Sequence, residues 1–387
     1  MHEGKIKPGT LNREHILKTF NNLNEAAADG YGKGWQTNGK ELPSRDALLM
    51  QRNLYKFSQA KDHAMLVELS NKLTKDGKIL PFNEFKKEAL KLNSTYNINY
   101  LQAEYQTANH SAKMAAFWET AVRNKKLFPN LKYKTQQDER VREKHKDLNN
   151  VIAPIESAFW KKYLPPLDFR CRCYPVQTAA EPTEKVPTIE IPKQFEMNVG
   201  ETKEIFNNTG AVPHPYFQLA KRSAKGKSNL PKIMEINKLD APYNTAYTAK
   251  NGAKVQVSMF ADLQDLESNY NDAVLIADKL LESFKIRPHL NGRKIIGVSN
   301  PEFEWNGKLG DKKTPKVKSP SKLLNKGNKQ GCEFVVFNFE NLNDELKYII
   351  ELKRILKKTS NYPLIKELFF IYKDKSVKYF SREEFIK

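Results

Sequence analysis

The chain has 387 residues, 39% of them hydrophobic and 11% aromatic, which is enough for two or three domains with cores of their own. A net charge of +20 favours a polyanionic partner, nucleic acid first and an anionic membrane second, although a lysine-rich proteome would produce the same excess. The three cysteines do not make a disulfide framework, no secretion signal opens the chain, and no apolar run is long enough to span a bilayer. We therefore expect synthesis in the cytoplasm.

The first part of the chain predicts helices. Apolar residues recur at helical spacing over residues 15–28, 85–92 and 111–126, and the last of these segments ends in basic residues. Proline and glycine separate the segments. We expect a mostly α domain over residues 1–178.

A Cys-x-Cys pair closes this region. Cys171 and Cys173 follow a charged helical segment that carries His145, and these three side chains offer ligands for a structural Zn²⁺. The alternative is a loop that packs on two small buried thiols, with an ion pair between Asp138 and Arg142. The spacing leaves both interpretations open.

The same region resembles the Mu-type F-like phage head morphogenesis family of minor capsid proteins. The resemblance covers about residues 45–178 and implies a helical capsid-associated domain in a virion, with portal and capsid proteins as partners. It rests on an ordered set of residues: Tyr133, Thr135, Asp138, Arg140, Arg142, His145, Phe159, Trp160, Pro165, Pro166, Cys171, Arg172 and Cys173.

Residues 179–250 are rich in proline and small residues, which is typical of a linker or connector. Beyond them, residues 251–387 predict an α/β domain. Strands are expected over 254–258, 294–298, 332–339, 368–372 and 377–380, and helices over 269–284 and 341–358. A mixed sheet with helices on its faces accommodates this order.

A hairpin inside this domain gathers charged residues. Asn306-Gly307 between two strand-like runs predicts a two-residue turn, and the resulting register places Glu302 opposite Asp311. Lys313 shares the face of Asp311 because strand side chains alternate. Opposed carboxylates destabilise a ladder unless a cation lies between them, so the pair predicts a site for Mg²⁺ or a similar divalent cation. The alternative is a solvated hairpin of mixed charge.

The segment from about residue 255 to 379 is similar to the core of PD-(D/E)XK nucleases. Within that group it resembles the toxin nucleases of contact-dependent growth inhibition proteins, several of which cleave tRNA. Glu302 matches the first acidic position, and Asp311 with Lys313 matches the D-x-K motif. The resemblance implies that these three residues are catalytic, with Glu302 and Asp311 as metal ligands. A further acidic ligand on the first helix would be Glu267, Asn269 or Asp272, and the sequence does not select one.

The sequence thus predicts a phage or prophage head protein that carries a toxin nuclease, with tRNA as the expected substrate and a small immunity protein as an expected partner. Two alternatives stay open: a capsid protein whose last domain is inactive, and a DNase that acts on phage or host DNA.

Overall fold

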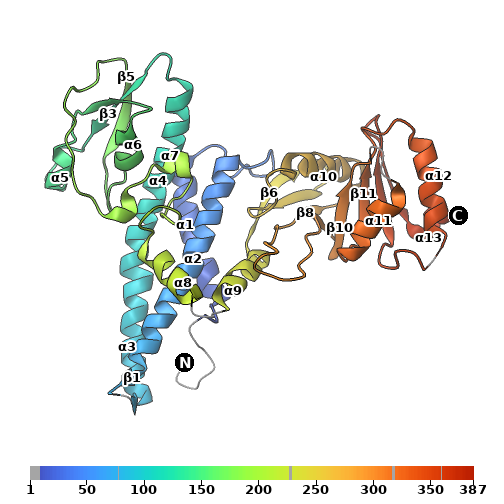
Figure 1. Ribbon diagram of the computed structural model, residues 1–387, viewed down its shortest axis with the longest axis horizontal. Helices are drawn as coiled ribbons and strands as arrows, with labels where there is room; N and C mark the ends of the chain where they lie inside the picture. Colours follow the sequence, from blue (N-terminus) through green and yellow to red (C-terminus); the bar gives the residue numbers. More distant parts are fainter. Residues whose placement is uncertain (1–8, 77, 226–228, 316–318, 359) are drawn as a thin grey trace. The chain divides into compact units, whose positions relative to one another are not determined.

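The computed structural model describes residues 9–76, 78–225, 229–315, 319–358 and 360–387, and the chain forms two compact units. The first unit comprises Met1–Trp35 and Asp46–Met234, and the second comprises Gln36–Arg45 and Glu235–Lys387. Figure 1 colours the chain along its sequence. Among the described helices, none has both the length and the apolar character that a membrane span requires.

Long helices form the body of the first unit: α1 (Arg13–Tyr31), α2 (Arg45–Lys72), α3 (Phe82–Ser94) and α4 (Leu101–Arg123). The side chain of Asn12 caps the start of α1 by accepting from the backbone N–H of His15 at 3.1 Å, and Gly32 ends the helix at φ +77°. A π-helical turn over Thr95–Tyr100 joins α3 to α4, and a short hairpin of β1 (Thr74–Lys75) and β2 (Lys78–Ile79) precedes α3. These helices confirm the α-rich prediction.

A small antiparallel sheet follows α4. Its strands are ordered β4 (Ile152–Pro154), β3 (Asn130–Lys134) and β5 (Tyr174–Thr178), and the short helices α5 (Glu143–Lys146) and α6 (Ala158–Tyr163) lie in its connections. Leu131 and Tyr133 of β3 are fully buried while the lysines between and after them are half-buried. This alternation is the strand signal that the sequence analysis did not use.

The proline-rich segment predicted as a linker contributes to both units. Residues 179–234 belong to the first unit, where they form the 3₁₀ turn Lys193–Phe195, α7 (Val199–Thr202), α8 (Pro215–Lys225) and most of α9 (Leu230–Ile236). Phe206 stacks on Phe57 of α2 with ring centroids 3.8 Å apart, and Asn53 makes two 2.9 Å hydrogen bonds with the Phe206 backbone. These contacts hold the segment against the helical body.

A mixed eight-stranded sheet forms the second unit, which confirms the predicted α/β class. The order is β13-β12-β11-β10-β9-β8-β7-β6; three neighbouring pairs are parallel (β7/β8, β10/β11, β11/β12) and the others antiparallel. The strands are β6 (Tyr243–Thr248), β7 (Lys254–Ser258), β8 (Phe284–Ile286), β9 (Phe303–Trp305), β10 (Lys308–Lys313), β11 (Phe334–Asn338), β12 (Glu367–Ile371) and β13 (Val377–Ser381).

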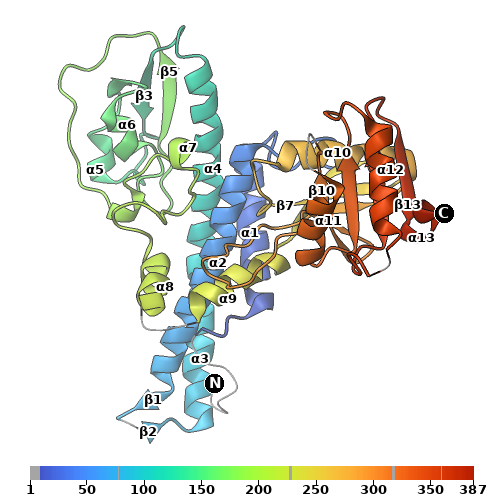
Figure 2. The ribbon, with the colours of Figure 1, turned by 45° about the vertical axis from the view of Figure 1, so that its right-hand side comes forward.

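Helices cover both faces of this sheet: α10 (Leu266–Leu280) on one, and α11 (Pro320–Lys329) and α12 (Glu345–Leu356) on the other, with α13 (Arg382–Ile386) after the last strand. Figure 2 shows α11 and α12 in front of the strands. The strand predicted over 294–298 is wrong, because these residues form turns in which the Ile296 side chain is 99% exposed. The predicted helix over 269–284 ends earlier, where Leu281 adopts φ +64°, and Phe284 begins β8.

Gly310 lies where an aromatic cluster leaves no room for a side chain. A Cβ at this position would approach the Phe334 ring to 2.2 Å, and that ring also packs against Trp305 and Phe284. We expect Gly310→Ala to lower the free energy of unfolding by about 1–3 kcal/mol, since overpacking forces neighbouring side chains aside. Urea denaturation measures it. Gly292→Ala is the control, because its Cβ would meet nothing closer than 3.9 Å, and an equal loss in both variants would contradict the steric account.

Candidate active site and metal centre

The predicted hairpin register is confirmed over the turn. Asn306 and Gly307 both have positive φ, at 48° and 76°, as a type I′ turn requires. Trp305 pairs with Lys308, and Glu304 pairs with Leu309, as expected from the sequence. The ladder continues to Phe303 and Gly310, so it stops one pair before Glu302 and Asp311.

Glu302, Asp311 and Lys313 nevertheless lie together at this end of the hairpin. The Lys313 ammonium forms an ion pair with the Asp311 carboxylate, and both side chains are almost fully buried. The Glu302 carboxylate accepts a hydrogen bond of 3.0 Å from the backbone N–H of Lys312, which lies between the other two residues. The fold therefore concentrates two carboxylates and one ammonium in a partly dry environment.

The pKa of Glu302 shows the effect of this arrangement. Burial, followed by the neighbouring Asp311 carboxylate, raises the pKa of Glu302 from 4.5 to about 7. The hydrogen bond from the Lys312 backbone and the charge of Lys313 oppose this shift. A cation bound between the two carboxylates would stabilise the ionised form of Glu302.

The variant Glu302→Gln tests the raised pKa of Glu302 through the pH dependence of the free energy of unfolding. Between pH 4.5 and about 7 the folded Glu302 keeps a proton that the unfolded chain releases, so the free energy of unfolding falls as the pH rises through this window. The variant is expected to lose this decrease and, above the window, to be more stable than the wild type by ~1–3 kcal/mol. Denaturation without divalent cations on either side of the window measures the difference. An unchanged pH slope would contradict the shift.

A pocket of about 530 Å³ opens onto Glu302, and its rim carries basic side chains together with the acidic Asp262 and Asp265. Arg287 lies beside Glu302, since its backbone N–H donates to the Glu302 carbonyl at 2.9 Å and its guanidinium donates to the Pro301 carbonyl at 3.1 Å. Lys326 and Lys329 extend the rim from α11, and His289 completes it. Sequence reasoning did not identify these four residues.

The three candidates for a further ligand on helix α10 lie in different environments. Asp272 is buried in an ion pair with Lys312 at 2.5 Å and accepts from Asn338 at 2.7 Å, on the sheet face opposite Asp311. Asn269, one turn earlier on α10, is buried and lines the pocket together with Glu302. Glu267 is exposed and is not among the residues that line the pocket.

A second cluster lies in the first unit, where His145, Cys171 and Cys173 converge. The His145 Nδ1 atom is 3.8 Å from each of the two sulfur atoms, and all three side chains are buried. Zinc bonds of about 2.0–2.3 Å to nitrogen and sulfur place tetrahedral ligands roughly 3.6 Å apart, so the cluster could hold a metal ion with little adjustment. A hydrogen bond between the two thiols lowers the pKa of Cys171 and raises that of Cys173, which favours one thiolate at Cys171.

The ion pair predicted between Asp138 and Arg142 is wrong. Asp138 instead binds Arg172 through two hydrogen bonds of 2.6 and 2.7 Å, and Arg142 pairs with Asp168 at 3.2 Å. The swap has a geometric reason: Arg172 lies between the two cysteines on a loop that faces Asp138, so a planar guanidinium can meet the carboxylate with two parallel bonds.

Comparisons with known proteins give two matches of different weight. The family model described as Phage Mu protein F like protein matches residues 75–176, and no curated protein matches the chain. A solved structure, the CdiA-CT/CdiI toxin and immunity complex from Burkholderia pseudomallei, aligns with 31% of this chain and 89% of its own at 16% identity and a TM-score of 0.23. Residues 75–176 of this chain, which include the His145, Cys171 and Cys173 cluster, are thus a domain similar to the Mu F-like phage head proteins.

Proposed function

We propose that the second unit is a metal-dependent endonuclease and that the chain is a phage head protein that carries it. The observation that supports the nuclease is the meeting of Glu302, Asp311 and Lys313, of which Glu302 lines a pocket that also carries Arg287, Lys326 and Lys329. The family match over residues 75–176 supports the phage head part, with portal and capsid proteins as partners.

The donor set fits a hard divalent cation such as Mg²⁺. Glu302 and Asp311 offer carboxylate oxygens, and burial, followed by the charge of Asp311, raises the pKa of Glu302. When bound there, the cation would polarise a phosphoryl oxygen and lower the pKa of a water molecule. The protein's own contribution is to hold the two carboxylates on adjacent backbone segments, with their positions fixed by the turn at Asn306 and Gly307.

Lys313 and the basic side chains around the pocket have different roles in the proposed reaction. Lys313, anchored by Asp311, stabilises negative charge that develops on phosphorus or orients the attacking water. Arg287, Lys326 and Lys329 bind the flanking phosphates of a polyanionic chain and place one phosphodiester bond near Glu302. The substrate we propose is RNA, with tRNA first.

Zinc is the metal we propose for the first unit. Two cysteine sulfurs and one histidine nitrogen suit Zn²⁺ better than they suit Mg²⁺. This site would tie the loop that carries Cys171 and Cys173 to helix α5, which carries His145, and so contribute to the stability of the Mu F-like domain.

Incubation of the purified full chain with total tRNA and, separately, with plasmid DNA tests the function. We expect tRNA to be cleaved in Mg²⁺ and to stay intact in EDTA. Cleavage of plasmid alone would favour the DNase alternative, and failure with both substrates in Mg²⁺ and Mn²⁺ would favour a capsid protein with an inactive second unit. An active nuclease would also require a small inhibitor in the cell that makes it, and this immunity protein should abolish cleavage when added.

A further inference from the structure

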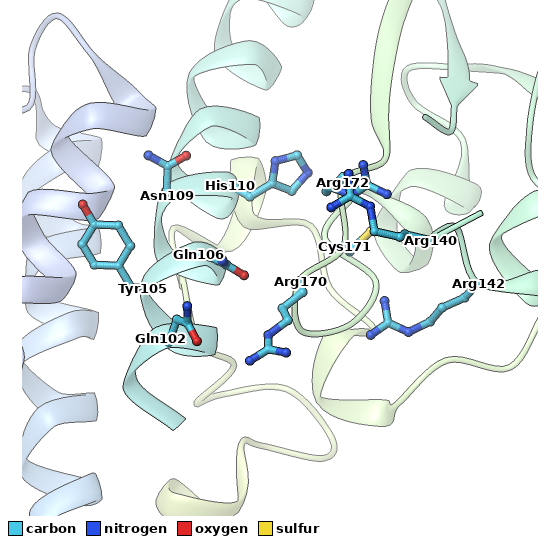
Figure 3. Close-up of a pocket in the computed structure, with 10 residues that line it drawn as sticks. All are labelled: Gln102, Tyr105, Gln106, Asn109, His110, Arg140, Arg142, Arg170, Cys171 and Arg172. Carbon is cyan, nitrogen blue, oxygen red and sulfur yellow. The ribbon is translucent and has the colours of Figure 1, made fainter. Parts of the chain in front are cut away.

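Another pocket, whose charged lining residues are basic, lies in the first unit, far from the proposed nuclease chemistry in sequence. It has a volume of about 780 Å³ and two walls of different character. One wall is helix α4, and the other is formed by the loops around β3 and β5 (Figure 3). The lining residues are Gln102, Tyr105, Gln106, Asn109, His110, Arg140, Arg142, Arg170, Cys171 and Arg172.

Arginine dominates the loop wall. Figure 3 shows the Arg170 side chain reaching toward α4 and the Arg142 guanidinium directed toward Arg170. Arg170 is exposed, and among the described residues no acidic side chain pairs with it. Such guanidinium groups are ready donors for an anion.

Acidic side chains compensate this charge only in part. Asp138 binds Arg172 through two hydrogen bonds and is 3.7 Å from Arg140, so one carboxylate serves two guanidinium groups. Asp168 pairs with Arg142 at 3.2 Å. Within the described part of the chain, no carboxylate is among the residues that line the pocket. The wall therefore keeps an excess of positive charge that a phosphate would neutralise with charge-assisted hydrogen bonds.

The helix wall offers the complementary groups for a base. Gln102 and Gln106 lie one helical turn apart on α4, and Gln106 extends toward the arginines, whereas Tyr105 and Asn109 are directed to the other side of the helix (Figure 3). The amide side chains of Gln102 and Gln106 present a donor and an acceptor together, which suits the edge of a nucleobase. The Asn109 amide is already engaged on the far side of α4, where it donates to the Ala26 carbonyl at 3.0 Å.

We propose that this pocket binds a nucleoside phosphate, with the phosphate on Arg140 and Arg170 and the base against α4. The volume is in the range of small-molecule sites, roughly 300–1,000 Å³. A second hollow of about 510 Å³ shares His110 and Arg172 with the pocket and adds Lys113 and Tyr174. The nucleoside phosphate can therefore be free or can be one unit of a single strand that continues past Arg172.

Calorimetric titration of the full chain distinguishes these sources. The chain carries Asp311→Asn, so that the proposed nuclease does not consume the ligand, and the probes are ATP, a short single-stranded DNA and inorganic phosphate. We expect ATP or the DNA to bind more tightly than inorganic phosphate. Tighter binding of ATP identifies a free nucleotide, and tighter binding of the DNA identifies a strand.

The arginine variants decide whether the pocket is responsible. Arg140→Gln combined with Arg170→Gln should weaken binding by about tenfold or more, because each guanidinium contributes a charge-assisted hydrogen bond. The melting temperature should not change, since both side chains are exposed. Arg123→Gln, on the exposed end of α4 and outside the pocket, is the matched control and should bind as the unmodified chain does.

Three results would overturn the proposal. The first is no binding of any probe, and the second is equal weakening by Arg123→Gln, which would indicate general attraction to a basic surface. The third is inorganic phosphate binding as tightly as ATP and the DNA, which would remove the role of the α4 wall. The nuclease proposal is independent of all three, because it rests on residues of the other unit.

Discussion

Replacing Lys313 with alanine is expected to slow phosphodiester cleavage by about 10²–10³-fold, the usual loss when one charge-stabilising group is removed from an active site. Its buried ammonium is paired with Asp311, and its charge also acts on Glu302. Binding of Mg²⁺ should persist, because the oxygen donors stay. Single-turnover cleavage of labelled tRNA and a Mg²⁺ titration followed by thermal unfolding measure the two properties separately.

Lys312 is the matched control for this prediction, because it is the neighbouring lysine and points to the opposite face. Its ammonium pairs with the buried Asp272 and donates to Ser268. Lys312→Ala should therefore cost stability, about 3–5 kcal/mol for a buried charge that has lost its partner. Below its melting temperature the variant should still cleave. If Lys312→Ala abolished cleavage while Lys313→Ala did not, the assignment of the two lysines would be reversed.

Replacing Cys171 with serine is expected to release the zinc of the first unit. Elemental analysis should find about one zinc per chain in the unmodified protein and none in the variant. The first unit should also lose several kcal/mol of stability, because metal binding and folding are linked. Cys332→Ala is the control, since Cys332 lies buried in the second unit and is not part of the cluster. A metal-free protein with normal stability would leave a packing role for the two thiols.

The turn chemistry explains how much of the candidate active site could be predicted from sequence. Asn306 and Gly307 restrict the hairpin to one turn type, so the register that brings Glu302 toward Asp311 follows from local residues alone. Alternation along β10 then puts Lys313 beside Asp311. These inferences needed no knowledge of the remaining sheet. The amphipathic helices α1 and α12 were predictable for the same reason, since their patterns are local.

The parts that failed depend on distant contacts. The apolar run 294–298 has strand-like composition, but none of the described strands pairs with it, and the segment forms turns instead. The basic rim joins Arg287 after β8 with lysines of α11, a helix the sequence analysis did not predict. The arginine pocket likewise combines residues of α4 with Arg140 and Arg142 of one later loop and Arg170 and Arg172 of another. No pattern within a short window reports such proximity.

The choice of a further metal ligand on the first helix depends on the three-dimensional structure. Three residues of the first helix were candidates for an additional metal ligand, and all are polar and close in sequence. The fold separates them: Asp272 is neutralised by Lys312, Glu267 is exposed, and Asn269 borders the Glu302 pocket. Helical spacing alone could not make this choice, because it depends on which face of β10 each helix residue meets.

The most direct test of the central claim is cleavage of total tRNA by the full chain and by Asp311→Asn, each in Mg²⁺ and in EDTA. The unmodified chain should cleave tRNA in Mg²⁺ and not in EDTA. Asp311→Asn should not cleave it in either condition, and its melting temperature should confirm that it stays folded. Cleavage that persists in EDTA would contradict the metal-dependent mechanism, and cleavage by Asp311→Asn at the unmodified rate would show that the hairpin is not the active site.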